Sequence, residues 1–233
     1  MQSRLLAAST LPLVLTSCLF LANQLHAQTP RMEITVERQV KGDKVEVTSP
    51  QHVFRSGDLV RFRFKPSFDG YLYVMDRSTS GKYLVLYPAK DAQETNHVER
   101  DREYLIPPSQ GEWFRVDDPP GYETVYFVIS PVELTKTAPT VQPLPPEPPP
   151  PGAPAELLPR CDDSVFRARG ECVDVLAGPH SVSKDDPLPA QLPSVPGTTA
   201  RDITVINKPT TTVVAPASGE NGPLIYEFRL AHK

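Results

Sequence analysis

The strongest constraint on the fold is a series of short segments between residues 31 and 134 in which apolar and polar residues alternate. In residues 60–65, Val and Phe side chains alternate with Arg and Lys. Successive side chains of a strand point to opposite faces of a sheet, so this segment predicts a strand with one buried and one wet face. Residues 70–75 are apolar at both parities, which predicts a central strand covered on both sides.

Similar segments fill the rest of this region, and turns rich in Gly, Pro, Asp and Ser separate them. We predict strands at residues 32–37, 44–48, 83–87, 104–106, 113–116 and 122–130. The first two flank Gly42-Asp43 and form a plausible opening hairpin. No stretch here has a sustained helical period. Many short strands with frequent turns predict an all-β fold, a single β-sandwich-like domain over residues 31–134.

The composition changes sharply after this region. Residues 131–200 hold 16 of the 28 prolines, including the run 148–151. Proline cannot donate a backbone hydrogen bond and favours extended polyproline II geometry. We therefore predict a long, largely irregular insertion or linker at residues 135–200. Its alternatives are a stiff spacer, the plainer interpretation, and a docking strip for a proline-binding domain.

Residues 201–233 return to strand-like patterns. Residues 203–206 and 210–214 are rich in β-branched side chains, and apolar residues alternate with charged ones over 224–230. An isolated hairpin is marginally stable in water. We therefore expect these C-terminal strands to complete the β domain, which makes the proline-rich stretch an insertion within it.

Two of the three cysteines indicate a disulfide. Cys161 and Cys172 enclose a short loop in the proline-rich region. A metal site is disfavoured, because the spacing is not Cys-x-x-Cys and the loop contains no His. We predict a structural bridge between them, within a small ordered loop on an otherwise loose tether.

The third cysteine belongs to an export signal. Residues 1–27 begin with Arg4 in a short positive region and continue into an apolar run too short to span a membrane, as in a signal peptide. Cleavage after Ala27 would release a soluble protein. The sequence Leu15-Thr16-Ser17-Cys18 instead resembles a lipobox, in which Cys18 would be the lipid attachment site. Either product is exported, to the periplasm or cell envelope.

The sequence lacks the common catalytic, phosphate-binding and metal-binding motifs. It has no Gly-x-Ser-x-Gly, no phosphate-binding loop, no His-Glu-x-x-His and no calcium loop. The formal net charge of −4 argues against nucleic-acid binding. We therefore predict no catalytic residue, no cofactor and no metal site, and expect a protein that is not an enzyme.

The basic side of residues 60–65 is the most suggestive candidate site. Arg61, Arg63 and Lys65 would share one face of a sheet and could meet an acidic wall polymer, lipid headgroups or carboxylates of a partner. The plainer interpretation is a solvated outer face that discourages aggregation. Four tyrosines could likewise form a carbohydrate-stacking platform or be ordinary packing residues, namely Tyr71, Tyr73, Tyr83 and Tyr87.

The order of several short motifs resembles the bacterial domain of unknown function family 4384. The motifs are Gly57-Asp58 before the alternating strand, Gly70-Tyr71-Leu72-Tyr73, Tyr87-Pro88, Ile106-Pro107 and Gly121-Tyr122-Glu123. The resemblance covers roughly residues 31–134. It implies a β-rich exported or envelope module, and it implies no defined catalytic residues.

These observations together predict a non-catalytic cell-envelope binding or scaffold module. Its expected partner is an envelope protein or a cell-wall polymer, with no nucleic acid, and with membrane contact only through a lipid anchor. Two alternatives stay open: a hydrolase with an unrecognised site, and a purely structural accessory subunit of a surface assembly.

Overall fold

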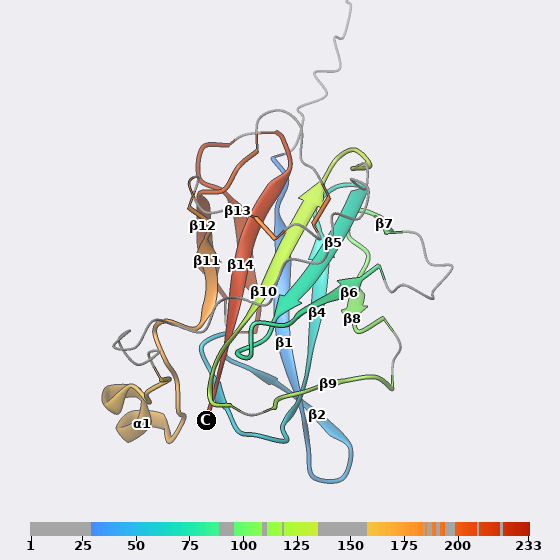
Figure 1. Cartoon of the computed structure of the whole chain (residues 1–233). Helices are drawn as coiled ribbons and strands as arrows, with labels where there is room; N and C mark the ends of the chain where they lie inside the picture. The colour runs from blue at the N-terminus through green and yellow to red at the C-terminus, as the bar shows by residue number, and fades with distance from the viewer. Residues whose placement is uncertain are drawn as a thin grey trace, which may run out of the picture.

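The computed structural model describes residues 29–88, 96–108, 111–117, 119–134, 158–183, 185, 188–189, 192–193, 199–208, 210–219 and 221–233. The predicted signal peptide with Cys18 and the proline run 148–151 lie outside these residues. The described chain forms two seven-stranded sheets packed face to face, with one short helix (Figure 1). This arrangement confirms the predicted all-β, sandwich-like fold. No helix in the described ranges is long and apolar enough to cross a membrane.

The first sheet has the strand order β12-β13-β1-β4-β8, with β2 paired to β1 and β9 paired to β4. Their bounds are β12 (Ile203–Asn207), β13 (Thr212–Pro216), β1 (Met32–Val40), β4 (Leu59–Pro66), β8 (Tyr104–Ile106), β2 (Lys44–Thr48) and β9 (Phe114–Arg115). The predicted opening hairpin is formed by β1 and β2.

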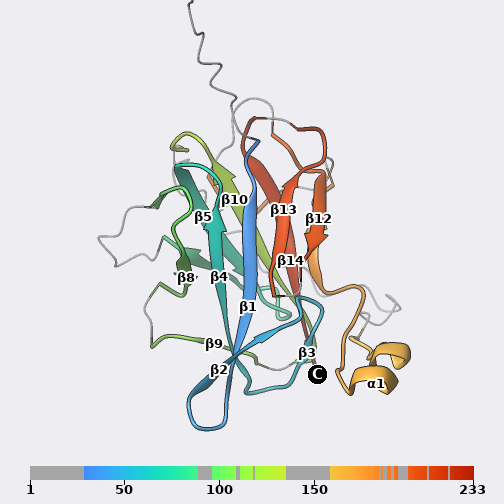
Figure 2. The ribbon, with the colours of Figure 1, turned by 180° about the vertical axis from the view of Figure 1, so that it is seen from behind.

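The second sheet has the order β11-β14-β10-β5-β6, with β3 paired to β14 and β7 paired to β5. Their bounds are β11 (Gly178–Ser181), β14 (Leu224–His232), β10 (Gly121–Ser130), β5 (Gly70–Arg77), β6 (Tyr83–Tyr87), β3 (Val53–Phe54) and β7 (His97–Val98). The C-terminal strands lie inside both sheets: β13 pairs with β1, and β14 runs between β11 and β10 (Figures 1 and 2).

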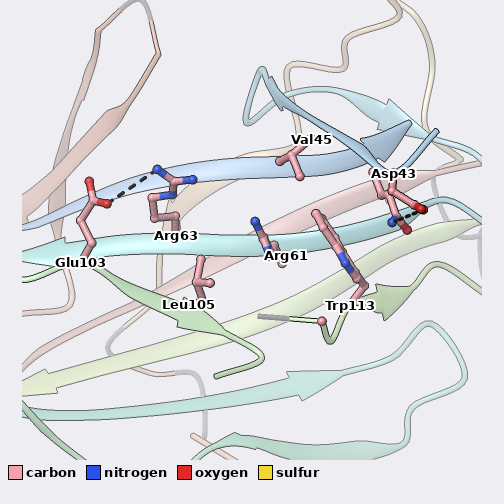
Figure 3. A pocket seen from close by; sticks show the side chains of 9 residues that line it. Asp43, Val45, Arg61, Arg63, Glu103, Leu105 and Trp113 are labelled. Carbon is pink, nitrogen blue, oxygen red and sulfur yellow. Dashed lines mark hydrogen bonds and ion pairs between the residues drawn. The ribbon is translucent and has the colours of Figure 1, made fainter. Parts of the chain in front are cut away.

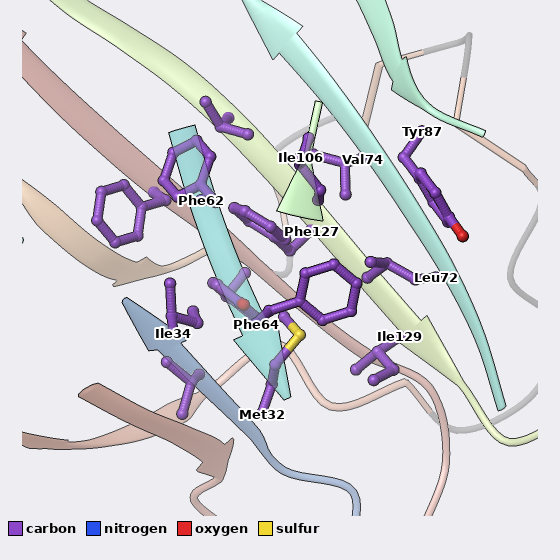
Figure 4. Close-up of a cluster of buried hydrophobic side chains, with 14 of the residues drawn as sticks. Met32, Ile34, Phe62, Phe64, Leu72, Val74, Tyr87, Ile106, Phe127 and Ile129 are labelled. Carbon is purple, nitrogen blue, oxygen red and sulfur yellow. The ribbon is translucent and has the colours of Figure 1, made fainter. Parts of the chain in front are cut away.

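The inward side chains of the two sheets form the main core. Val60, Phe62 and Phe64 of β4 are fully buried, as their alternation predicts. Phe62 contacts Phe127 of the opposite sheet edge to face, with 5.4 Å between ring centroids (Figure 4). Since these rings come from both layers, the contact holds the sandwich together rather than one sheet.

The outer face of the second sheet is also covered. Tyr73 and Met75 of β5 pack there against Leu134, Val182 and Leu192. This explains why residues 70–75 are apolar at both parities. Part of the predicted insertion is built into the domain, because β11 is a strand of the sheet and the side chains of Val182 and Leu192 complete a second apolar cluster.

The disulfide loop is docked on the sandwich, which corrects the expectation of a small loop on a tether. Cys161 and Cys172 form the disulfide. The Val53 amide donates to the Cys172 carbonyl at 2.9 Å. The Tyr122 hydroxyl donates to Asp174 Oδ2 at 2.8 Å. These bonds join the loop to β3 and β10, so it is part of the folded domain.

The helix of the loop, α1 (Asp163–Arg169), has a capping residue at each end. The Asp162 side chain accepts hydrogen bonds from the Ser164 and Val165 amides and so caps the N-terminus. Gly170 ends the helix with φ 70°, a left-handed conformation that costs glycine little.

If the chain is cut once between residues 135 and 157, we expect the two fragments to stay bound to each other. The two fragments would share the β10–β14 ladder, which pairs Gly121 through Ile129 with Leu224 through His232. The disulfide lies wholly in the C-terminal fragment, so the ladder rather than a covalent bond would hold them. A protease site inserted there, followed by size-exclusion chromatography without and with denaturant, measures this. Separation of the fragments without denaturant would show that the sheets do not depend on β14.

Candidate binding groove

A groove of about 600 Å³ lies on the outer face of the first sheet (Figure 3). It crosses β1, β4 and β8, with the β1–β2 turn at one end. The lining side chains are mostly polar or charged around a few apolar ones, and they are Gln39, Asp43, Val45, Arg61, Arg63, Glu103, Leu105 and Trp113, with Gly111. This face is therefore unlike the outer face of the second sheet, which is covered by an apolar cluster.

A buried carboxylate, Glu37, lies beneath the groove. It is 1% exposed and faces Arg61 across the β1–β4 pair. Arg61 Nε donates to Glu37 Oε2 at 2.7 Å, and the Arg63 guanidinium forms an ion pair with Glu37 Oε1. One buried negative charge thus sits between two positive charges.

The Trp113 ring forms one wall. The Arg61 guanidinium carbon lies 4.2 Å from the ring centroid, which is a cation–π contact. Arg61 is therefore held both by its ion pair with Glu37 and by its contact with the Trp113 ring. Trp113 stays partly exposed, and Val45 and Leu105 add apolar surface nearby (Figure 3).

The rim of the groove carries paired donors and acceptors. The Arg63 side chain is 40% exposed, and its Nη1 lies 3.7 Å from Glu103 Oε2. Gln39 Nε2 donates to Asp43 Oδ1 at 3.1 Å. The rim therefore presents amide, guanidinium and carboxylate groups together rather than one sign of charge.

The basic residues predicted as a face are only partly brought together. Arg61 and Arg63 line the groove, and Lys65 lies on the same side of β4 but outside the lining. Arg61 shares the outer face with the other two, but it is not solvated there, because it is buried against Glu37. Sequence reasoning missed Glu37 because it comes from another strand and meets Arg61 only through the β1–β4 register.

The four tyrosines, for which a stacking platform and ordinary packing were both open, do not share one surface. Tyr87 belongs to the core between the sheets, whereas Tyr73 packs on the outer face of the second sheet. Tyr71 is partly buried against the ring of His97, and Tyr83 is exposed. The packing interpretation therefore describes Tyr73 and Tyr87.

A second cluster of ionisable groups, Asp76, Glu123 and His232, lies at one end of the second sheet. Their neighbours two residues away on β5, β10 and β14 belong to the core between the sheets, so alternation points all three inward. Asp76 and Glu123 share a side-chain hydrogen bond. His232 Nε2 lies 3.6 Å from Glu123 Oε1, and His232 is 1% exposed.

Electrostatics in this cluster favour a shared proton. Burial first, then the charge of Glu123 and the hydrogen bond to it, raise the pKa of Asp76 to about 8. A proton held between the two carboxyl groups makes their contact a hydrogen bond rather than a repulsion. The sequence signals none of this, since the three residues are far apart along the chain. Among the residues that the structure describes, no group of three or more His, Cys, Asp or Glu is arranged to hold a metal ion.

Comparison with known proteins supports the resemblance seen in the sequence. Residues 53–133 match the family model of a domain of unknown function, DUF4384. No curated protein and no solved structure matches the chain. The matched range contains Arg61, Arg63 and Trp113, whereas Glu37 and Val45 lie before it. The groove is thus built by the matched domain together with the β1–β2 hairpin.

Proposed function

We propose that this protein is an exported, non-catalytic binding module of the cell envelope that holds a stretch of a cell-wall polysaccharide in the groove above Glu37. The observation that carries the proposal is that two carboxylates, the buried Glu37 and the rim residue Glu103, together balance the charges of Arg61 and Arg63. An anionic ligand would have to compete with Glu37 for both guanidinium groups. The groove is therefore better suited to a neutral ligand that uses the remaining hydrogen-bonding capacity.

The rim chemistry matches a polyhydroxylated ligand. A guanidinium carries five N–H donors and a carboxylate accepts several hydrogen bonds. Arg63, Glu103 and Asp43 can therefore each bind hydroxyl groups in addition to their contacts within the protein. The partly exposed Trp113 ring and the Val45 and Leu105 side chains offer apolar surface to the C–H faces of sugar rings. The groove crosses β1, β4 and β8, so an extended ligand can contact all three strands.

A protein ligand is the second candidate, and one observation favours it. Val45 and Val47 of β2 are 44% and 49% exposed beside the groove. Strand β2 pairs only with β1 among the described strands, so its other edge presents backbone donors and acceptors. An extended segment of an envelope protein could add to that edge.

Trp113→Ala is expected to weaken binding of isolated wall glycan chains by about tenfold, because one aromatic contact contributes on the order of 1.4 kcal/mol. Titration calorimetry with soluble glycan chains measures the dissociation constant. Trp113→Phe should retain most of the affinity, since a ring remains over Arg61. Tyr83→Ala removes an exposed aromatic ring from the other sheet and serves as the matched control.

Two results would contradict the glycan proposal. One is an absence of glycan binding by the intact protein under conditions in which it is folded. The other is capture of an envelope protein that Val47→Lys abolishes and Trp113→Ala does not. The second result would assign the β2 edge, rather than the groove, as the contact surface.

A further inference from the structure

We propose that Asp76, Glu123 and His232 form a pH-sensitive latch, in which a proton shared by the two carboxyl groups holds the ends of β5, β10 and β14 together. This inference rests on the fold alone and is independent of the proposed function. Three adjacent central strands each contribute one of the groups. In register, Asp76 lies opposite Val125 and Glu123 lies opposite Leu230, so Glu123 is the diagonal neighbour of both Asp76 and His232.

The surroundings leave this cluster few compensating partners. Asp76 Oδ1 and both ring nitrogens of His232 are buried without a hydrogen bond. Across the neighbouring strands, Asp76 faces Leu84 of β6 and His232 faces Phe54 of β3, and neither of these can ionise. The charged groups acting on Asp76 are Glu123, which disfavours its ionisation, and Arg77, which favours it less strongly.

Proton loss therefore places two carboxylates next to each other in a poorly solvated site. Like charges at hydrogen-bonding distance repel strongly there, whereas a shared proton makes the contact attractive. The cluster is thus tight when protonated and loosened when deprotonated.

The end of the sheet held by this latch is also where the disulfide loop attaches. The Lys233 amide, next to His232, donates to the Phe54 carbonyl at 3.1 Å, and the Val53 amide donates to the Cys172 carbonyl. Thr79, in the turn between β5 and β6, donates its amide to Glu123 Oε1 at 3.4 Å. Loosening the latch should therefore reach the β5–β6 turn, the C-terminus and the edge of the loop.

The sign of the pH dependence follows from the raised pKa of Asp76. The folded protein binds this proton more tightly than the unfolded chain, whose Asp has its ordinary pKa of 3.8. The contribution is fully present below about pH 4, declines as the pH rises to about 8, and is constant above that.

The test compares the full chain with Asp76→Asn and with Asp163→Asn, whose exposed carboxyl on α1 has no such partner. Infrared spectroscopy should show the carbonyl band of a protonated carboxyl at neutral pH, and the band should vanish near pH 8 and be absent in Asp76→Asn. Hydrogen exchange, corrected for its intrinsic pH dependence, should rise about tenfold in residues 78–82 and 231–233 as that band vanishes, and stay flat in Asp76→Asn.

Glu123→Gln provides a second variant if Asp76→Asn folds poorly. It removes the negative charge and keeps a side chain of the same shape, so the Asp76 band should vanish at a lower pH than in the unmodified protein. Absence of a protonated carboxyl at neutral pH would overturn the proposal. So would the same rise in exchange in Asp76→Asn as in the unmodified protein.

Discussion

Replacing Glu37 by Ala is expected to lower the free energy of unfolding by about 3–5 kcal/mol, the usual cost of removing one partner from a buried ion pair. Glu37 forms ion pairs with Arg61, which is itself buried, and with Arg63. Without the carboxylate, the buried Arg61 charge loses its ion pair, whereas its contact with the Trp113 ring remains. Urea unfolding of the variant and the unmodified protein measures the difference.

A matched control is available on the same strand and the same face. Glu33 is half exposed and pairs with Lys208 at 3.1 Å, so Glu33→Ala should cost no more than about 1 kcal/mol. Equal effects at positions 33 and 37 would mean that the Arg61 charge reaches solvent when Glu37 is lost. Glu37→Gln should fall between, because the amide keeps the shape and can still accept one hydrogen bond.

The ion pair between Arg61 and Glu37 also changes the result that we expect when the basic side chains are replaced by acidic ones. If Arg61, Arg63 and Lys65 were all solvated on the outer face, replacing them by Glu would leave the fold intact. With Arg61→Glu, however, a second carboxylate would face the buried Glu37. The triple variant is therefore expected to unfold, and loss of binding by it would say nothing about the ligand. Lys65→Glu alone tests the surface charge without this cost.

The strands could be predicted from the sequence because their information is local. Alternation in residues 60–65 reports which side chains are buried, and turn residues mark where each strand ends. The partner of Arg61 could not be predicted, since it depends on register between β1 and β4. The Asp76–Glu123–His232 cluster has the same character, because each member looks like an isolated polar residue at a strand end.

The docked part of the proline-rich region was missed for a different reason. Val182 and Leu192 are single apolar residues among polar ones and prolines, so they carry no periodic signal. Their burial follows from the exposed apolar face of β5 and β10, which needs a cover. The apolar residues at both parities in 70–75 predict that a cover exists, but they do not identify the segment that supplies it.

Reduction of the Cys161–Cys172 disulfide is expected to lower the melting temperature of the whole domain by roughly 6–12 °C. Closing a loop with a sequence separation of 11 constrains the unfolded chain by about 3 kcal/mol. This constraint stabilises the domain only if the loop folds together with it. The docking contacts indicate that it does: Asp174 accepts from Tyr122 and from the Arg160 and Leu176 amides, and Cys172 packs on the cluster of Val53, Ala177 and Ala231.

Calorimetry of the oxidised and reduced protein measures this shift, and the Cys161→Ala/Cys172→Ala double variant should match the reduced protein. Adding reductant to that variant should change nothing, which separates the bridge from other effects of the reagent. Tyr122→Phe removes one docking bond and keeps the disulfide, so it should make the loop melt earlier and reduce the effect of the bridge on the domain. An unchanged melting temperature on reduction would mean that the loop unfolds before the sandwich, and that its bonds to β3 and β10 stabilise the loop alone.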